Sequence, residues 1–273
     1  MWTQVISASV QGDSHKRTNK ECQDSLKAHI IDDIAILAAA DGHGSDSCPH
    51  SRTGAEVAVE TFCDILNQYI HDYSNDYDAL ISLLNREGET TIARAIDNEW
   101  KHRIDGLHKT NNREMPLTDD GDIDHARIWR LYGTTLLGLV ITPLFYFAFQ
   151  LGDGDIILLH ENSSDYAVQG DKLLGTETHS LCHIDAWKKA IANVRRHPEE
   201  YTPYAFMLST DGFANSYPSE AEFLQTCVDY YSAIREHGAN TVESNLGNWL
   251  DETSASGSGD DITVLFALPL SPL

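Results

Sequence analysis

Aspartate residues recur at the ends of apolar segments that have the length of a β-strand. Asp41 follows the apolar run 34–40, Asp153 follows 145–151, Asp211 follows 206–209, and the pair Asp260-Asp261 precedes 262–266. Strand ends are rigid, so carboxylates placed there can be held at fixed separations. Carboxylates are hard oxygen ligands, which suit Mg²⁺ or Mn²⁺ better than Zn²⁺. The pattern therefore indicates a site for a hard divalent cation.

Glycine follows three of these aspartates, at positions 42, 154 and 212. A glycine lets the backbone turn sharply and brings a carbonyl close to whatever the aspartate binds. A single Asp-Gly pair is more often a hairpin turn, but several pairs at strand ends weaken that interpretation. The run Asp153-Gly154-Asp155 could also begin a Ca²⁺ loop, although it lacks the remaining ligands and the twelfth-position glutamate of an EF-hand.

The first half of the chain has the periodicity of strands followed by long helices. Residues 5–10 alternate as a strand does, and the apolar runs 30–31 and 34–40 flank Asp32-Asp33, which predicts a hairpin. Apolar residues recur every three or four positions over 53–73, which predicts an amphipathic helix, and a second helical pattern covers 77–104. Residues 105–124 turn polar and are expected to form a loop.

The second half returns to strands and ends with helices and a last strand. Residues 134–141, 144–151 and 156–159 are predicted to form an antiparallel meander, and 161–200 give no clear pattern. A strand at 205–209, helices at 220–236 and 241–250, a loop at 253–259 and a strand at 262–267 follow. Locally paired strands with helices between them predict an α+β fold in which helices cover antiparallel sheets.

Length, charge and cysteine content limit the class of protein. The 273 residues are 41% hydrophobic, enough for one large core, and we expect a single domain over 1–273. The formal charge is 19 minus 42, or −23, spread along the chain, which argues against nucleic acid or an anionic membrane as a partner. Five cysteines without a C-x-x-C pair indicate neither a disulfide framework nor a thiolate zinc site, so a reducing, cytoplasmic location is expected. The longest apolar stretch, 136–151, is interrupted by Thr142, Pro143 and Gln150, and no signal segment opens the chain, so neither membrane spanning nor export is expected.

Six short motifs along the chain resemble, in order, those of the metal-dependent protein phosphatase 2C (PPM) family. They are Gln23-Asp24, Ala40-Asp41-Gly42-His43-Gly44, Tyr132-Gly133-Thr134-Thr135-Leu136, Leu151-Gly152-Asp153-Gly154, Ser209-Thr210-Asp211-Gly212-Phe213 and Gly259-Asp260-Asp261-Ile262-Thr263-Val264. Each motif is weak alone, whereas their combination in this order is a strong signal. Ser14-His15 and Cys22-Gln23-Asp24 resemble a bacterial branch with a modified first motif.

The resemblance implies a fold, a cofactor and a set of ligands. The implied fold is a four-layer α-β-β-α sandwich of two antiparallel sheets flanked by helices, and the implied activity is protein serine/threonine phosphatase. Two Mn²⁺ or Mg²⁺ ions are implied, with Asp41 bridging them and Gly42 offering its carbonyl. The remaining implied ligands are Asp211 and Asp260 for one ion, Asp24 for the other, and Asp153 for a third, weaker ion. The presence of Asp153 is explained equally well by a turn in a β-meander as by a role in binding this third ion.

The chemistry of phosphate esters shows why cations would be needed. A phosphate dianion is repelled by carboxylates, so cations must supply the positive field. Two cations about 3.5 to 4 Å apart lower the pKa of a water between them and direct it at phosphorus. The serine or threonine oxygen that leaves needs a proton, and His43 resembles the family histidine placed for that role. Outside this motif, a solvated loop histidine would be the preferred interpretation.

The sequence departs from the family pattern at two positions in the first motif. Asn19 stands where the family usually has an arginine that binds substrate phosphate, so the resemblance leaves Arg17 or His15 for that role. Gln23 replaces the usual acidic residue before Asp24, which implies a weaker cation site. The substrate implied is a phosphorylated protein, such as a target of a cognate serine/threonine kinase.

Two other functions remain open at this point. A catalytically weak or inactive binding or regulatory protein could keep the phosphatase fold, and Asn19 and Gln23 favour that alternative. A metal-dependent phosphodiesterase or nuclease is the other, but a nuclease needs a basic groove and the net charge is −23.

Overall fold

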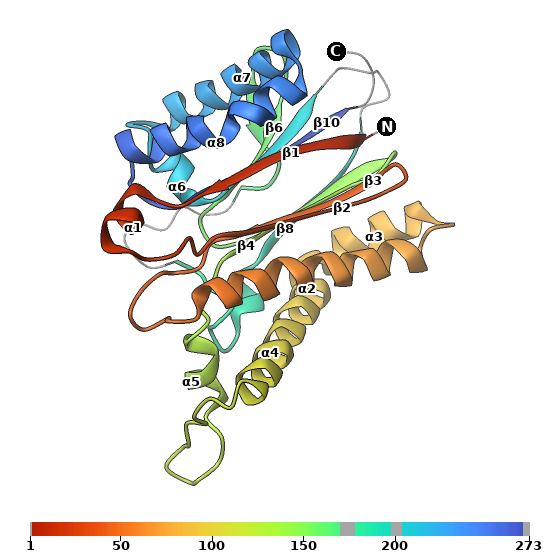
Figure 1. Ribbon diagram of the computed structural model, residues 1–273. Helices are drawn as coiled ribbons and strands as arrows, with labels where there is room; N and C mark the ends of the chain where they lie inside the picture. The colour runs from red at the N-terminus through yellow and green to blue at the C-terminus, as the bar shows by residue number, and fades with distance from the viewer. Residues whose placement is uncertain (1, 170–177, 198–203, 270–273) are drawn as a thin grey trace.

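The computed structural model describes residues 2–169, 178–197 and 204–269, which form two stacked antiparallel sheets between layers of helices (Figure 1). Sheet A contains, in spatial order, β1 (Trp2–Val10), β10 (Ile262–Pro269), β9 (Ala205–Ser209), β6 (Asp155–Leu159) and β7 (Ser164–Tyr166). Sheet B contains β2 (Ser25–Ile31), β3 (Ile34–Ala40), β4 (Leu136–Ile141), β5 (Phe145–Leu151) and β8 (Ile191–Arg196). The α+β sandwich predicted from the sequence is confirmed.

Helices cover the outer face of each sheet. α2 (Ser51–Asp72) and α3 (Tyr77–Glu87) lie against sheet B, α4 (Ala93–Thr110) packs on α2, and the π-helix η1 (Gly88–Ile92) joins α3 to α4. Against sheet A lie α7 (Glu220–His237) and α8 (Ala239–Ser256). The short helices are α1 (Asp13–Thr18), α5 (His125–Arg130), the 3₁₀ turn η2 (Ala186–Lys189) and α6 (Asp211–Ala214). No helix in the described ranges is long and apolar enough to span a bilayer.

The alternation of side chains along β3 shows how the layers are held together. Ile36 and Ala38 face the helical layer, while Ala35 and Leu37 face the opposite sheet, and all four are buried. Both faces of a strand must be apolar when a sheet lies between a second sheet and helices, which explains the continuous apolar runs of β3, β4 and β5. A third core lies between sheet A and the α7–α8 layer.

A glycine in the middle of β4 allows α2 to pack closely on sheet B. A Cβ added to Gly138 would lie 2.2 Å from the ring of Phe62, a fully buried residue of α2. Glycine in a strand interior often marks such a close approach. The start of α2 is also close to the end of β3, because a Cβ added to Gly42 would lie 2.8 Å from the backbone of Ser51.

The predicted meander is wrong at its third strand. β4 and β5 form a hairpin, but β6 pairs with β7 and β9 in sheet A, so residues 152–154 cross between the sheets. Gly152 has φ +115°, and the Gln150 Nε2 group donates to the carbonyls of Gly152 (3.1 Å) and Gly154 (2.7 Å). These local bonds stabilise a crossing whose sequence has the composition of a hairpin turn.

Other predicted elements differ mainly at their ends. The second helical segment continues to Thr110 through the π-helix, so the loop expected from 105 begins at 111. α8 likewise extends to Ser256, into the loop expected at 253–259. Residues 161–200, which gave no pattern, contain β7, η2 and β8, while 170–177 and 198–200 lie outside the described residues. The helices α1, α5 and α6 were not predicted, because four to six residues are too few to show a helical period.

Candidate metal centre

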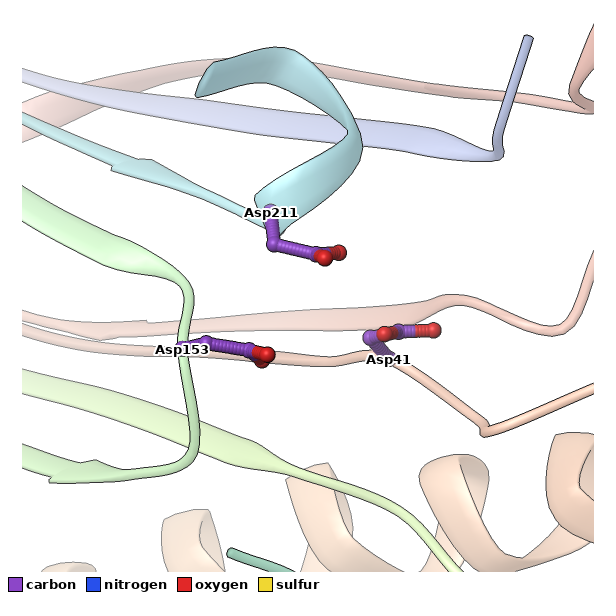
Figure 2. Close-up of side chains that lie close together, drawn as sticks. All are labelled: Asp41, Asp153 and Asp211. Atoms are coloured by element: carbon purple, nitrogen blue, oxygen red, sulfur yellow. The ribbon is translucent and has the colours of Figure 1, made fainter. Parts of the chain in front are cut away.

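Three aspartates from distant parts of the chain meet at the edge where the two sheets face each other. One ligand oxygen from each of Asp41, Asp153 and Asp211 lies within 4.8 Å of the others. Figure 2 shows their carboxylates pointing toward a common space, from the end of β3, from the crossing loop and from the start of α6. Carboxylates gather in this way in sites for hard divalent cations.

The threonines that follow Gly133 fix the backbone of Asp41. The Thr135 N–H and the Thr134 hydroxyl donate to the Asp41 carbonyl at 2.9 and 2.8 Å, and the Asp41 N–H donates to the Thr135 hydroxyl at 3.0 Å. Gly42 also bridges to Thr134. Asp41 is therefore held against the start of β4 by bonds that leave its carboxylate free to face the cluster.

Asp24 is a buried carboxylate that uses only one of its oxygens within the described chain. The Thr210 hydroxyl donates to Asp24 Oδ2 at 2.8 Å and accepts from the Thr263 N–H at 2.9 Å. The other oxygen, Oδ1, and the neighbouring Gln23 Oε1 are buried and have no hydrogen-bond partner among the described residues. A buried acceptor without a donor is costly, so both oxygens suit a ligand that bonds to them.

Asp260 and Asp261 are adjacent in sequence but make different contacts. Asp261 accepts from the N–H groups of Gly12 (2.6 Å) and Gln23 (2.7 Å), and its Oδ1 lies 2.9 Å from His15 Nδ1. Asp260 is half exposed, and His15 Nε2 lies 3.8 Å from its Oδ1. Asp261 thus positions the segment that carries Asp24. Asp260 is not one of the three aspartates within 4.8 Å of one another, although its charge acts on Asp41 and Asp211.

The two candidates for phosphate binding lie differently. His15 is largely buried between Asp260 and Asp261. Arg17 is 76% exposed and pairs with Asp13 one turn earlier on α1. Arg17 would have to leave this ion pair to reach a phosphate at the cluster.

Burial and mutual repulsion raise the pKa values of the clustered carboxyl groups. Burial is the largest cause at Asp41, whose pKa lies well above the usual range, followed by the charges of Asp24, Asp211, Asp260 and Asp153. Burial likewise raises the pKa of Asp24 and of Asp211 to about 7, and the charges of Asp153 and Asp260 add to the rise at Asp211. Carboxylates held together against such a cost mark a functional site, and a divalent cation would relieve the repulsion. The oxygen donors, the Asp24 Oδ1 atom that no described residue bonds to, and the concentrated negative charge all fit Mg²⁺ or Mn²⁺.

His43 lies against the loop that ends at Thr134. The backbone N–H of His43 donates to the Gly133 carbonyl at 3.1 Å, and a Cβ on Gly133 would lie 2.6 Å from the His43 ring. Burial, the largest cause, lowers the pKa of His43 below its ordinary value. Residue 133 must be glycine for the ring to occupy this position.

The sequence motifs contained the hydroxyl groups that organise the site, but their roles could not be predicted. Thr134, Thr135 and Thr210 each bond to one of the candidate ligands, across 93, 94 and 186 residues of sequence. The only signal was their place beside glycine and aspartate in the motifs.

The comparisons with known proteins agree with this architecture. Residues 11–251 match the model of the family described as protein phosphatase 2C. No curated protein sequence is significantly similar to the chain.

Solved structures with the same fold include bacterial phosphatases. Magnesium-bound RsbX matches with a TM-score of 0.52 and 16% identity, covering 98% of this chain and 100% of its own. The serine/threonine phosphatase PstP/Ppp of Mycobacterium tuberculosis matches with a TM-score of 0.58 and 15% identity, covering 98% and 99%. The catalytic domain of PstP in complex with two manganese ions matches with a TM-score of 0.58 and 16% identity, covering 98% of this chain and 98% of its own.

Proposed function

Because this chain belongs to the protein phosphatase 2C family, we propose that it hydrolyses phosphoserine and phosphothreonine in proteins, with divalent cations held by its aspartates. The meeting of Asp41, Asp153 and Asp211 at one edge of the sandwich is the observation that carries this proposal. These residues are separated by 112 and 58 positions, so their convergence is not a local turn effect. The manganese and magnesium complexes of structures with this fold support the choice of ions.

The aspartates have separate roles in this proposal. Asp41 would bind both of two cations and Gly42 would offer its backbone carbonyl. Asp211 and Asp260 would bind one of the cations, and Asp24 the other. The burial of Asp24, with Oδ1 unpartnered in the described chain, supports its role. Asp153, which completes the close cluster, would hold a third cation.

The reaction transfers the phosphoryl group to water and releases the serine or threonine hydroxyl. When bound, the cations activate the attacking water and neutralise the charge of the phosphate. As the bond from phosphorus to the side-chain oxygen breaks, His43 in its protonated form would give a proton to that oxygen and return to neutral imidazole; without it the oxygen would leave as a strongly basic alkoxide. The half-buried ring of His43 packs against Gly133, which supports a defined position for the proton donor.

Either His15 or Arg17 could bind the phosphate, and the contacts favour His15. Its ring already lies between Asp260 and Asp261, within the candidate site. Arg17 is exposed and engaged with Asp13.

The proposal is tested by measuring phosphate release from a phosphothreonine peptide. We expect Mn²⁺-dependent turnover that EDTA abolishes, and a loss of more than about 100-fold in Asp41→Asn, because even residues that only support metal ligands cost 10- to 100-fold. Asp229→Asn, on the exposed side of α7, is the matched control and should keep full activity. Turnover that survives both EDTA and Asp41→Asn would reject the proposal.

A regulatory protein without catalysis is the second candidate. Gln23 favours it, because an amide next to Asp24 contributes no charge to a cation site. Folded protein that binds Mn²⁺ in a calorimetric titration, but never releases phosphate, would identify this alternative.

A further inference from the structure

A groove lined by arginines lies beside the candidate metal centre, on the helical side of sheet B. It has a volume of about 670 Å³ and lies between the loop that follows α4, the short helix α5 and His50. Arg113, Arg127 and Arg130 line it, together with the acidic Glu114. In Figure 1, α5 lies at the same end of the sheets as α1 and α6. We call this feature the arginine groove.

Positive charge is unusual on this chain, whose net charge is −23. Arginines elsewhere are mostly neutralised by carboxylates, as in the ion pairs of Arg17, Arg52, Arg86, Arg103, Arg196 and Arg235. In the groove, Arg127 pairs with Asp124, but neither Arg113 nor Arg130 has a carboxylate partner within the described residues. Guanidinium groups that no carboxylate of the described residues neutralises can, in so acidic a protein, bind an external anion.

A chain of buried hydrogen bonds holds Arg113 in place. Its guanidinium donates to the Tyr132 hydroxyl and lies over the Tyr132 ring, 5.4 Å from its centre. His108 Nε2 donates to the Glu114 carbonyl at 2.9 Å, and His108 Nδ1 is hydrogen-bonded to the Tyr132 hydroxyl at 3.1 Å. His108 and Tyr132 are 1% and 0% exposed. Arg113 is thus oriented before any ligand arrives, which lowers the entropic cost of binding.

The groove and the metal centre share a stretch of backbone. Gly42 pairs with Thr134, the His43 N–H donates to the Gly133 carbonyl, and the His50 N–H donates to the Leu131 carbonyl at 2.9 Å. Leu131 lines the groove, and the hydroxyl of Thr134 bonds to Asp41. Thr134 is three positions after Leu131, so their Cα atoms are at most about 11 Å apart. An extended peptide covers that distance in roughly three to four residues.

We propose that the arginine groove binds an acidic segment of the protein substrate, a few residues away from the phosphorylated side chain. This inference rests on the proposed function and specifies its substrate class. Carboxylates of the segment would pair with Arg113 and Arg130 while the phosphorylated residue lies at the aspartate cluster. Counting side-chain reach, the acidic residues would stand roughly three to six positions from the phosphorylated residue.

The test compares matched phosphothreonine peptides with glutamates or glutamines at those positions, on either side of the phosphothreonine. For the wild-type chain we expect kcat/KM to be about fivefold higher for the glutamate peptide at physiological salt, and the preference to shrink as salt is raised. Arg130→Gln should bring the ratio close to one. Arg130 is exposed, so this change should not disturb folding, and Arg113→Gln provides a second variant. Arg94→Gln is the control, because Arg94 stacks on Trp187 at 4.2 Å, outside the groove, and should keep the wild-type ratio.

A direct binding measurement separates this inference from the proposed function. Anisotropy of a labelled, unphosphorylated glutamate peptide should show binding to the metal-free full chain that Arg130→Gln abolishes, whether or not the protein turns over any substrate. Equal kcat/KM for both peptides in the wild type, or an unchanged preference in Arg130→Gln, would overturn the inference. Self-association that Arg130→Gln removes, without any peptide preference, would assign the groove to a second copy of the chain and also overturn it.

Discussion

Replacing Asp211 by asparagine should stabilise the metal-free protein while removing its activity. Burial, with the charges of Asp153 and Asp260, raises the pKa of Asp211 to about 7, against about 3.9 in an unfolded chain. Between pH 4 and pH 7 the folded state therefore binds more protons than the unfolded state, and the free energy of unfolding falls as the pH rises. Above pH 7 the full cost of the charged Asp211 is present. Asparagine removes that charge, and its oxygen can still accept from Asn215 Nδ2.

The size of the effect follows from the shift in pKa. A rise of about 3 pKa units corresponds to about 4 kcal/mol at most. Asparagine loses part of the hydrogen bonding of a carboxylate, so we expect a gain of about 2 kcal/mol at pH 8. For a chain of this length that gain raises the Tm by about 4–8 °C. At pH 4 the gain should vanish, because Asp211 is then protonated in the folded wild type.

Thermal melts with and without Mn²⁺, at pH 4 and pH 8, provide the assay. In EDTA at pH 8 the variant should melt above the wild type, whereas added Mn²⁺ should stabilise the wild type more than the variant. Asp229→Asn, on the outer face of α7, controls for the general loss of a negative charge. A variant that melts at or below the wild type in EDTA at pH 8, or a control that gains as much, would refute the electrostatic account of the cluster.

Two further predictions concern His43 and Gly138. His43→Gln should lower kcat for a phosphothreonine peptide by about 10²–10⁴-fold, but kcat for an aryl phosphate much less, because an aryl leaving group needs no proton. Steady-state kinetics on both substrates test this, with His71→Gln at an exposed position as the control. Equal losses of kcat on the two substrates would exclude proton donation by His43. Gly138→Ala should cost about 1–3 kcal/mol in urea unfolding, since its Cβ would meet the Phe62 ring at 2.2 Å. The matched control is Gly247→Ala on α8, where the added Cβ meets open space, and this variant should be neutral or stabilising by up to about 1 kcal/mol. If Gly138→Ala were as stable as the wild type, the contact between α2 and β4 would adapt freely to the added methyl group.

Periodicity was sufficient for the long elements of the fold. The helix at 53–73 and the apolar strand at 34–40 have 21 and 7 residues, enough for a period to be visible, and both are confirmed to within two residues at each end. Strands with two buried faces show continuous apolar runs, and these runs predicted β3 and β5 directly.

The path of residues 152–154 could not be predicted, because it depends on contacts made elsewhere. Gly152-Asp153-Gly154 has the composition of a hairpin turn, yet β6 pairs with β9, whose sequence begins about fifty residues later. Tertiary pairing with sheet A therefore outweighed the local signal. The positions of the aspartates were predicted from the ends of strands alone. The hydroxyls of Thr135 and Thr210 contact Asp41 and Asp24 only in the folded chain, so sequence spacing could not predict their roles.

Because residues 152–154 cross from one sheet to the other, the aspartate cluster links the two halves of the sandwich. Asp41 belongs to sheet B, Asp211 to the end of sheet A, and Asp153 to the strand connection that joins them. A metal centre that joins these three groups through its ions would cross-link the halves of the sandwich without a covalent bond. Its removal should loosen the packing between the sheets, so amide hydrogen exchange in β3 and β9 would report the occupancy of the centre from the interior of the protein.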